Sequence, residues 1–271
     1  MAAPQPRSVK GLQRADAVGT SSKTTRILGG VLLVGVVIWL ALAFVVTEPD
    51  IRIDGTSGQE IGQFDAFRLI YVHLPVIAVT YTAFALTSLG SLMVLIKRSV
   101  WWDLVAGAAA EIGALGAALT LVTGAIWGRP IWNTWWEWGD VRVLTTFVLL
   151  MLSLGYLAVR RLEGTAEERA RRSAIVGLLL MVNVLIVNRS VEWWASQTIH
   201  QDSTIAEAAI GGSKAWTVFF SIALGMGLFS WMMIHRFRLA WLERQFDRFG
   251  LDDALTSRRA EAAAVLEGEM S

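Results

Sequence analysis

The sequence contains no cysteine. That absence excludes disulfide bonds, thiolate metal sites, iron–sulfur clusters and thiol nucleophiles. Charge is also scarce, because Asp, Glu, Lys and Arg make up only 17% of the 271 residues, whereas ordinary soluble domains carry roughly 25%. Hydrophobic residues, by contrast, account for 54%. This balance is typical of a protein whose surroundings are largely apolar.

Long apolar runs recur along the chain. A helix needs about 20 mostly apolar residues to cross the hydrocarbon layer of a bilayer. The sequence has six candidate runs: Arg26–Val46, Phe67–Ile96, Leu104–Trp127, Val143–Val159, Ala174–Val187 and Ala215–Ile234. The fifth is short, but the capping sequence Thr165-Ala-Glu-Glu predicts that its helix starts earlier. We therefore expect an all-α, polytopic integral membrane protein with six transmembrane helices.

Basic residues are unevenly distributed between the two sides of this predicted membrane domain. Eighteen of the 24 Lys and Arg residues lie on the side that holds the N-terminus. The positive-inside rule then places both termini in the cytoplasm. The same rule explains the basic residues without any nucleic acid, so we expect no nucleic-acid partner.

These patterns divide the chain into three parts. Residues 1–25, rich in Ser, Thr, Gly and charge, are expected to form a disordered cytoplasmic segment. Residues 26–236 form the six-helix membrane domain, and residues 237–271 form a cytoplasmic tail. Large apolar residues and arginines between Trp241 and Phe249 predict that part of this tail is an amphipathic helix lying on the anionic membrane surface.

Tryptophan is concentrated in one predicted outward loop, residues 127–142. The stretch W-G-R-P-I-W-N-T-W-W-E-W holds five of the 13 tryptophans, namely Trp127, Trp132, Trp135, Trp136 and Trp138. Interfacial tryptophans usually form passive belts, but such a density in one loop exceeds that use. We expect these indoles, with Trp193 and Trp194 of the next outward loop, to hold a flat, apolar ligand. Gly128, Pro130 and Gly139 are expected to shape the turns.

Only three histidines occur, and two of them fall on the predicted outward face. His73 lies in Y-V-H-L-P near the outer end of the second run, where Pro75 is expected to kink the helix. His200 lies in the third outward loop, whereas His235 sits at the cytoplasmic boundary. Taken singly, each is explained by a bond to water or a carbonyl. As a pair beside tryptophan-rich sequence, His73 and His200 have the chemistry of axial haem ligands.

Arginines complete this predicted site. Arg129, Arg142 and Arg189 are expected on the same face, where guanidinium groups pair well with carboxylates such as haem propionates. The leading hypothesis is non-enzymatic haem binding and delivery. One alternative is a membrane cytochrome subunit that exchanges electrons with quinone. Another is a permease subunit whose tryptophans only anchor helices.

Three segments also resemble a known family. W-G-R-P-I-W-N-T-W-W-E-W-G-D-V-R is similar to the tryptophan-rich WWD motif of haem-handling proteins in cytochrome c maturation. Y-V-H-L-P and S-V-E-W-W-A-S-Q-T-I-H-Q resemble the two histidine segments of its CcmC branch, the haem exporter protein C type. The resemblance runs from about Phe67 to Met233.

The resemblance implies a function and partners. It implies that haem b is bound as cargo at the outer face of the bacterial cytoplasmic membrane, with His73 and His200 as axial ligands. The loop tryptophans and Asp140 would hold the porphyrin. Delivery would be to the periplasmic chaperone CcmE, with the ABC-transporter subunits CcmA and CcmB and the small membrane protein CcmD as partners.

The match departs from the family pattern at the carboxylate. The pattern W-D-x-R-L-T is replaced by W-G-D-V-R-V-L-T, so that Gly139 separates Trp138 from Asp140. Either Asp140 or Glu137 therefore remains a candidate for the carboxylate of the motif.

One ionisable residue lies inside the third apolar run. Glu111 is costly at that depth and is by default a functional candidate. A structural alternative is that Glu111 is protonated and hydrogen-bonded to a neighbour such as Asn183.

Overall fold

The computed structural model describes residues 22–200 and 210–269 of the chain. Within them, six helical segments are long and apolar enough to cross a membrane, which confirms the predicted number of spans. They are built by α2 (Lys23–Ala41), α3 (Ile70–Lys97), α4 (Val100–Trp132), α5 (Val141–Val159), α6 (Ala166–Trp193) and α7 (Gly212–Glu269). A π-helical turn, Leu42–Val46, extends α2, and a 3-10 turn, Asp65–Leu69, precedes α3.

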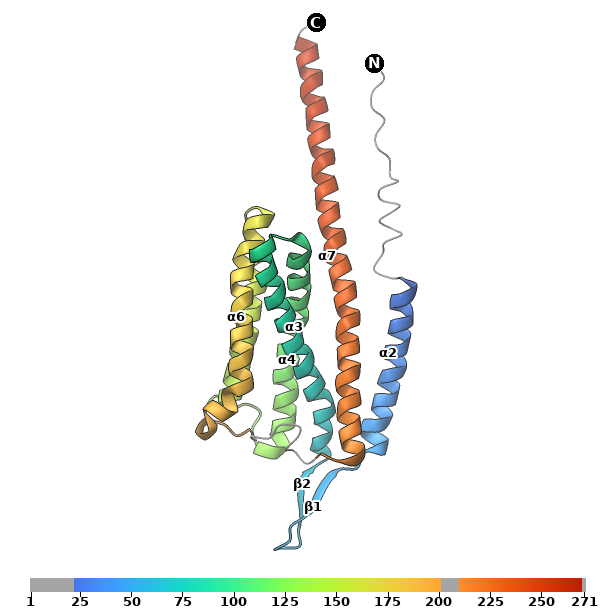
Figure 1. The fold of residues 1–271 in the computed structure, drawn as a ribbon, viewed down its shortest axis with the longest axis vertical. Coiled ribbons are helices and arrows are strands. Elements are labelled where there is room, and N and C mark those ends of the chain that lie inside the picture. Colours follow the sequence, from blue (N-terminus) through green and yellow to red (C-terminus); the bar gives the residue numbers. More distant parts are fainter. Residues whose placement is uncertain (1–21, 201–209, 270–271) are drawn as a thin grey trace.

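The helices run alternately up and down between two ends of the molecule (Figure 1). We call the lower end in this view, where the loop after α4 lies, the tryptophan end, and the opposite end the basic end. Residues 22 and 269, the limits of the described chain, both lie toward the basic end. The predicted disordered segment falls largely outside the described residues. Its last residues are helical, because Ser22 and Thr25 form a capping box that starts α2 at Lys23.

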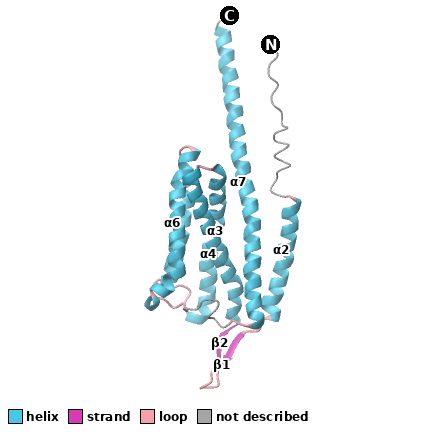
Figure 2. Cartoon of the chain, viewed as in Figure 1, coloured by secondary structure: helices cyan, strands magenta, loops and turns pink. Residues whose placement is uncertain are grey.

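A small β-hairpin at the tryptophan end was not predicted. Strands β1 (Asp50–Ile53) and β2 (Glu60–Phe64) pair antiparallel, and they are the only strands in the described part of the chain (Figure 2). Asp54 organises the turn between them, since its carboxylate accepts hydrogen bonds from the backbone N–H of Thr56 at 2.9 Å and of Ser57 at 2.6 Å. The prediction of an all-α protein is confirmed for the membrane-spanning segments, whereas the connection between the first and second spans contains this hairpin.

Helix α3 is the centre of the membrane domain. It packs against α4, α6 and α7, while α5 packs against α4 and α6. Helices α3–α6 thus form a four-helix bundle with a buried core that includes Phe84, Leu149, Tyr156 and Leu180. Helix α7 covers one side of α3 and α4, and α2 lies on the far side of α7 (Figure 1).

Glycines allow α3 and α4 to approach closely, as small residues generally do between membrane helices. A Cβ atom added at Gly113 would lie 2.6 Å from the Phe84 ring. One added at Gly116 would collide with the Thr80 side chain, and one at Gly90 would lie 2.9 Å from the Cβ of Ala106. We call this contact between α3 and α4 the glycine seam.

One expectation was a hydrogen bond between Glu111 and Asn183, and this expectation was wrong. Glu111 forms a two-pronged ion pair with Arg236 of α7, in which Nη2 lies 2.6 Å from Oε1 and Nε donates to Oε2. Asn183 instead donates to the carbonyl of Thr145 at 3.1 Å. The charge of Glu111 inside the span is therefore matched by the guanidinium group of another helix.

Replacing Glu111 with alanine should destabilise the protein, because it leaves the Arg236 guanidinium without its closest partner. We expect a loss of about 1–3 kcal/mol, measured as a lower thermal midpoint in detergent. Glu243→Ala is the matched control, since Glu243 lies 3.7 Å from Arg236 and is more exposed. A Glu111 variant as stable as the Glu243 variant would show that this ion pair does not hold α7 to α4.

The C-terminal tail continues the axis of α7. The helix runs without a break from Gly212 to Glu269, a length of about 87 Å at 1.5 Å per residue. Its C-terminal part extends beyond the bundle at the basic end (Figure 1). The residues expected to form an amphipathic tail helix are therefore helical as part of α7, and their contact with the membrane surface stays a prediction.

Candidate functional site

The loop that carries the tryptophans is shorter than the predicted segment 127–142. Helix α4 continues to Trp132 and ends at Asn133, which adopts a left-handed conformation with φ 55°. Asparagine tolerates that conformation better than most residues. Helix α5 then starts after Asp140, whose Oδ1 accepts the N–H of Val143 at 2.8 Å. Only residues 133–140, which we call the tryptophan loop, lie outside the two helices.

Gly128 and Pro130 therefore lie in the last turns of α4 and do not shape a loop, contrary to expectation. Gly128 has a different effect, because a Cβ there would lie 2.7 Å from the six-membered ring of Trp132. Helical side chains lean over the preceding turn, so the glycine provides the space in which this indole lies. Trp132 is thereby placed beside His200, with ring centroids 4.8 Å apart.

A cavity of about 400 Å³ opens between α3, α4, α5 and α6 at the tryptophan end. Both predicted ligands, His73 of α3 and His200 beyond α6, line its wall. Three of the predicted tryptophans also line it: Trp132, Trp135 and Trp136. The structure thus brings together five of the predicted site residues, which come from separate segments of the sequence.

Other predicted tryptophans lie near the cavity without lining it. Trp127 packs edge-on against His73, with ring centroids 5.6 Å apart, and its Nε1–H donates to Gln63 at 2.9 Å. Trp138 is 63% exposed and packs against Trp136 and Phe147. Their direct contact with a ligand stays a prediction.

Three further predicted residues are directed elsewhere. Trp193 and Trp194 pack against each other at 5.8 Å and are exposed. Arg129 bonds to Asn133 and lies over the ring of Trp135. None of the three lines the cavity. Their assignment as ligand contacts also stays a prediction.

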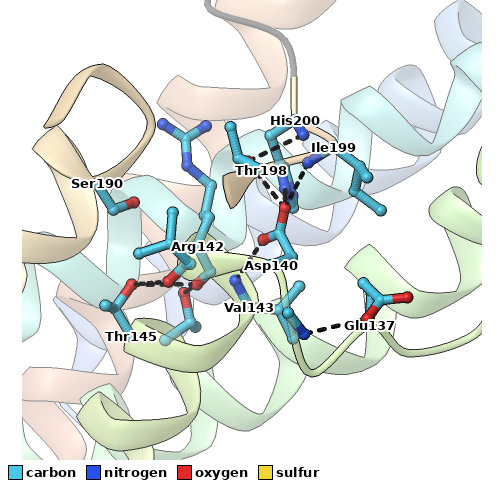
Figure 3. A network of polar contacts seen from close by, with 12 residues as sticks. Glu137, Asp140, Arg142, Val143, Thr145, Ser190, Thr198, Ile199 and His200 are labelled. Atoms are coloured by element: carbon cyan, nitrogen blue, oxygen red, sulfur yellow. Dashed lines mark hydrogen bonds and ion pairs between the residues drawn. The ribbon is translucent and has the colours of Figure 1, made fainter. Parts of the chain in front are cut away.

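His200 is held by Asp140. The Nδ1 atom of His200 lies 3.0 Å from Oδ2 of Asp140, and the backbone N–H of Ile199 and the hydroxyl of Thr198 donate to the same oxygen at 2.8 Å (Figure 3). The Asp140 side chain is fully buried. One carboxylate therefore joins the start of α5 to the segment that follows α6.

The pKa of Asp140 is well below its usual range. Burial raises this pKa, but the hydrogen bonds from His200 and from the backbone N–H of Val143 and Ile199 lower it by more than burial raises it. An ionised carboxylate only accepts hydrogen bonds. The proton shared with His200 is therefore on Nδ1, which leaves Nε2 as the ring nitrogen whose lone pair is available whenever the ring is neutral.

The other candidate carboxylate, Glu137, has a local role. Its Oε1 accepts the N–H of Gly139 at 3.1 Å, within the tryptophan loop. Glu137 lines the cavity, but the structure shows no bond from it to either histidine. Figure 3 shows it on the side of the loop away from His200. Geometry thus favours Asp140 as the carboxylate that supports a ligand.

His73 has a partner that the sequence did not reveal. Its Nδ1 atom lies 2.8 Å from the hydroxyl of Thr123, one helix away on α4. Threonine is common in membrane helices and usually bonds to its own backbone, so nothing in the sequence distinguished this residue. Pro75 does not end α3, which continues through it, and Gly225 of α7 packs closely against this proline.

Polar groups at the cavity wall would suit a ligand that carries negative charge at its edge. Arg142 and Arg189 line the cavity, and Arg189 is paired with Glu192 at 2.7 Å. The indole Nε1–H of Trp136 is buried without a hydrogen-bond partner. A buried donor of this kind is unusual in a native structure, and a ligand acceptor would satisfy it.

Comparison with known proteins agrees with this arrangement. The family model described as Heme exporter protein C, CcmC, matches residues 15–250. The Heme exporter protein C of Escherichia coli strain K12 is 33% identical over 196 residues, covering 70% of this chain and 79% of that protein. The proteins of the same name from Bradyrhizobium diazoefficiens and Haemophilus influenzae are 32% identical over 177 residues (65% of each chain) and 31% identical over 189 residues (69% and 76%). Since the match includes all six spans, the chain belongs to the haem exporter protein C family.

Proposed function

We propose that this protein binds haem b as cargo at the outer face of the bacterial cytoplasmic membrane and delivers it to a periplasmic haem chaperone of the CcmE type. His73 and His200 are the axial ligands in this proposal. The observation that carries it is that two histidines from distant segments line one cavity, each with its Nδ1 atom already bonded within the protein.

The two Nδ1 bonds decide which ring nitrogen meets the iron. With Nδ1 engaged by Thr123 in one ring and by Asp140 in the other, Nε2 is the atom that remains for a metal. Two imidazoles alone make a poor site for a free ion, and the described residues contain no group of three or more His, Asp or Glu side chains that could hold one. A porphyrin supplies the remaining four nitrogen ligands itself.

The rest of the cavity suits a flat ligand with two acidic groups. The indoles of Trp132, Trp135 and Trp136 offer apolar faces. Arg142 and Arg189 provide positive charge for the propionates. The volume of about 400 Å³ lies within the range of known small-molecule pockets.

The position of the site relative to the membrane follows from charge. In the sequence, eighteen of the 24 Lys and Arg residues fall in the segments on the side of the membrane domain that holds the N-terminus, and the positive-inside rule places that side in the cytoplasm. The cavity, at the other end, then faces outward. Membership in the family supports a role for this chain in haem export for cytochrome c biogenesis, as a component of a transporter. We propose CcmA, CcmB and CcmD as its partners in the membrane.

A direct test is to purify the full chain in detergent, add haemin, and record absorption spectra during titration. We expect saturation at one haem per chain with the spectrum of a six-coordinate, low-spin iron, because two imidazoles bind from opposite faces. A chain that shows no saturable haem binding would overturn the proposal. Rapid reduction of the bound iron by a quinol would favour instead the alternative of a membrane cytochrome.

A further inference from the structure

The two histidines at the cavity are held by chemically different partners. Asp140 presents a buried carboxylate to Nδ1 of His200 at 3.0 Å. Thr123 presents a neutral hydroxyl to Nδ1 of His73 at 2.8 Å. The site is therefore asymmetric even though its two ligating side chains are the same.

The hydroxyl of Thr123 is placed to accept a hydrogen bond from His73. Its oxygen lies 2.7 Å from the carbonyl oxygen of Leu119 and 3.3 Å from that of Thr120. Carbonyl oxygens donate nothing, so the hydroxyl proton has an acceptor there. With the proton in that position, the lone pairs of the hydroxyl oxygen face His73, whose Nδ1 then carries a hydrogen.

These different partners have different effects on the imidazoles. A carboxylate that accepts the N–H of a ligating histidine raises the basicity of the opposite nitrogen. A hydroxyl whose proton is already donated elsewhere orients the ring in the same way, but brings no negative charge. Nε2 of His200 is thus the stronger electron donor, and Nε2 of His73 is the weaker.

We propose that Thr123 is a positioning residue that fixes the tautomer of His73 and makes it the weaker of the two axial ligands, so that the His73 bond breaks first when haem is released. This inference rests on the proposed function, since it assumes that both histidines bind the iron. A carrier benefits from such an arrangement, because one firm ligand retains the haem while the other side opens to an acceptor.

Substitutions at Thr123 test the role through the properties of bound haem. Thr123→Ser keeps the hydroxyl and should match wild type. Thr123→Val removes the acceptor, so we expect haem transfer to excess apomyoglobin to be about tenfold faster or more and the reduction potential of the iron to rise. Thr123→Asp supplies a carboxylate and should slow transfer and lower the potential. Opposite shifts for the last two variants would not arise from a purely structural role.

A matched control lies on α3, the helix that carries His73. The hydroxyl of Thr82 bonds to the carbonyl of Ala78 at 2.8 Å, and Thr82 does not line the cavity. Thr82→Val should therefore leave both the transfer rate and the potential unchanged. If Thr123→Asp fails to fold, the comparison of Thr123→Val with Thr123→Ser and Thr82→Val still decides the matter.

The single-ligand variants test the predicted order of ligand strength. His73→Ala retains the stronger ligand and should lose haem to apomyoglobin more slowly than His200→Ala. The reverse order, or a Thr123→Val variant that behaves like wild type, would overturn this inference while leaving haem binding intact. If wild type does not bind haemin, or if both single variants keep a six-coordinate spectrum, the proposed function itself fails.

Discussion

Protein in which His73 and His200 are both replaced by alanine is expected to bind no haem in a saturable manner. Both rings line one cavity, and their Nδ1 bonds leave only Nε2 for the iron. Loss of a residue that merely supports a metal ligand typically costs 10–100-fold in affinity, so loss of both ligands should cost more than about 100-fold. Haemin titration followed by absorption measures this loss directly.

The third histidine of the chain provides the control. His235 lies on α7 toward the basic end, where its ring packs against Trp231 with centroids 4.5 Å apart. His235→Ala removes an imidazole of the same kind and should leave the titration unchanged. Each single variant at the cavity should give a five-coordinate or mixed spectrum. Normal haem binding by the double variant would show that the ligands lie elsewhere.

Asparagine at position 140 is expected to give the next largest effect. Oδ2 of Asp140 accepts three hydrogen bonds, from His200, Ile199 and Thr198. The asparagine oxygen can replace one oxygen of the carboxylate, but its amide nitrogen then faces donors and must turn away or displace them. We expect haem affinity to fall about 10–100-fold, as for other supporting residues of metal ligands.

Glu137→Gln is the matched control for Asp140→Asn, because it also neutralises one carboxylate of the same loop. The one side-chain bond that the structure shows for Glu137 is to the nearby N–H of Gly139. Its replacement should therefore change haem affinity by less than about threefold, which corresponds to roughly 0.5 kcal/mol. If the Glu137 variant loses haem and the Asp140 variant keeps it, then Glu137 is the carboxylate of the motif.

The membrane domain could be predicted from sequence because crossing a bilayer requires long apolar runs. The ends of the helices could not be predicted in the same way. Helix α4 continues past Trp127 to Trp132, although its last turns are rich in Trp and contain Pro130. The β-hairpin was missed since its strands are only four and five residues long and mostly exposed, without the alternation of a half-buried strand.

The sequence predicted the two histidines that line the cavity, but it did not predict which residues bond to them. His73 and His200 were recognisable because histidine is rare in this chain and these two fall on the predicted outward face. The bond from Thr123 to His73 spans 50 positions, and the bond from Asp140 to His200 spans 60. Such pairings depend on how helices pack, and packing of this kind leaves no local pattern in a single sequence.

The glycine seam has a consequence for how cargo is exchanged. At Gly113 and Gly116 there is no spare room between α3 and α4, and Thr80, which contacts the seam, also lines the inner part of the cavity. Tight packing leaves that part of the wall little room to change shape. We therefore expect any rearrangement on ligand binding to fall on the rim, where the tryptophan loop and residues 195–200 lie outside long helices. A wall that needs no rearrangement lowers the cost of binding, so in the proposed function haem would load and leave at the rim without a change in the bundle.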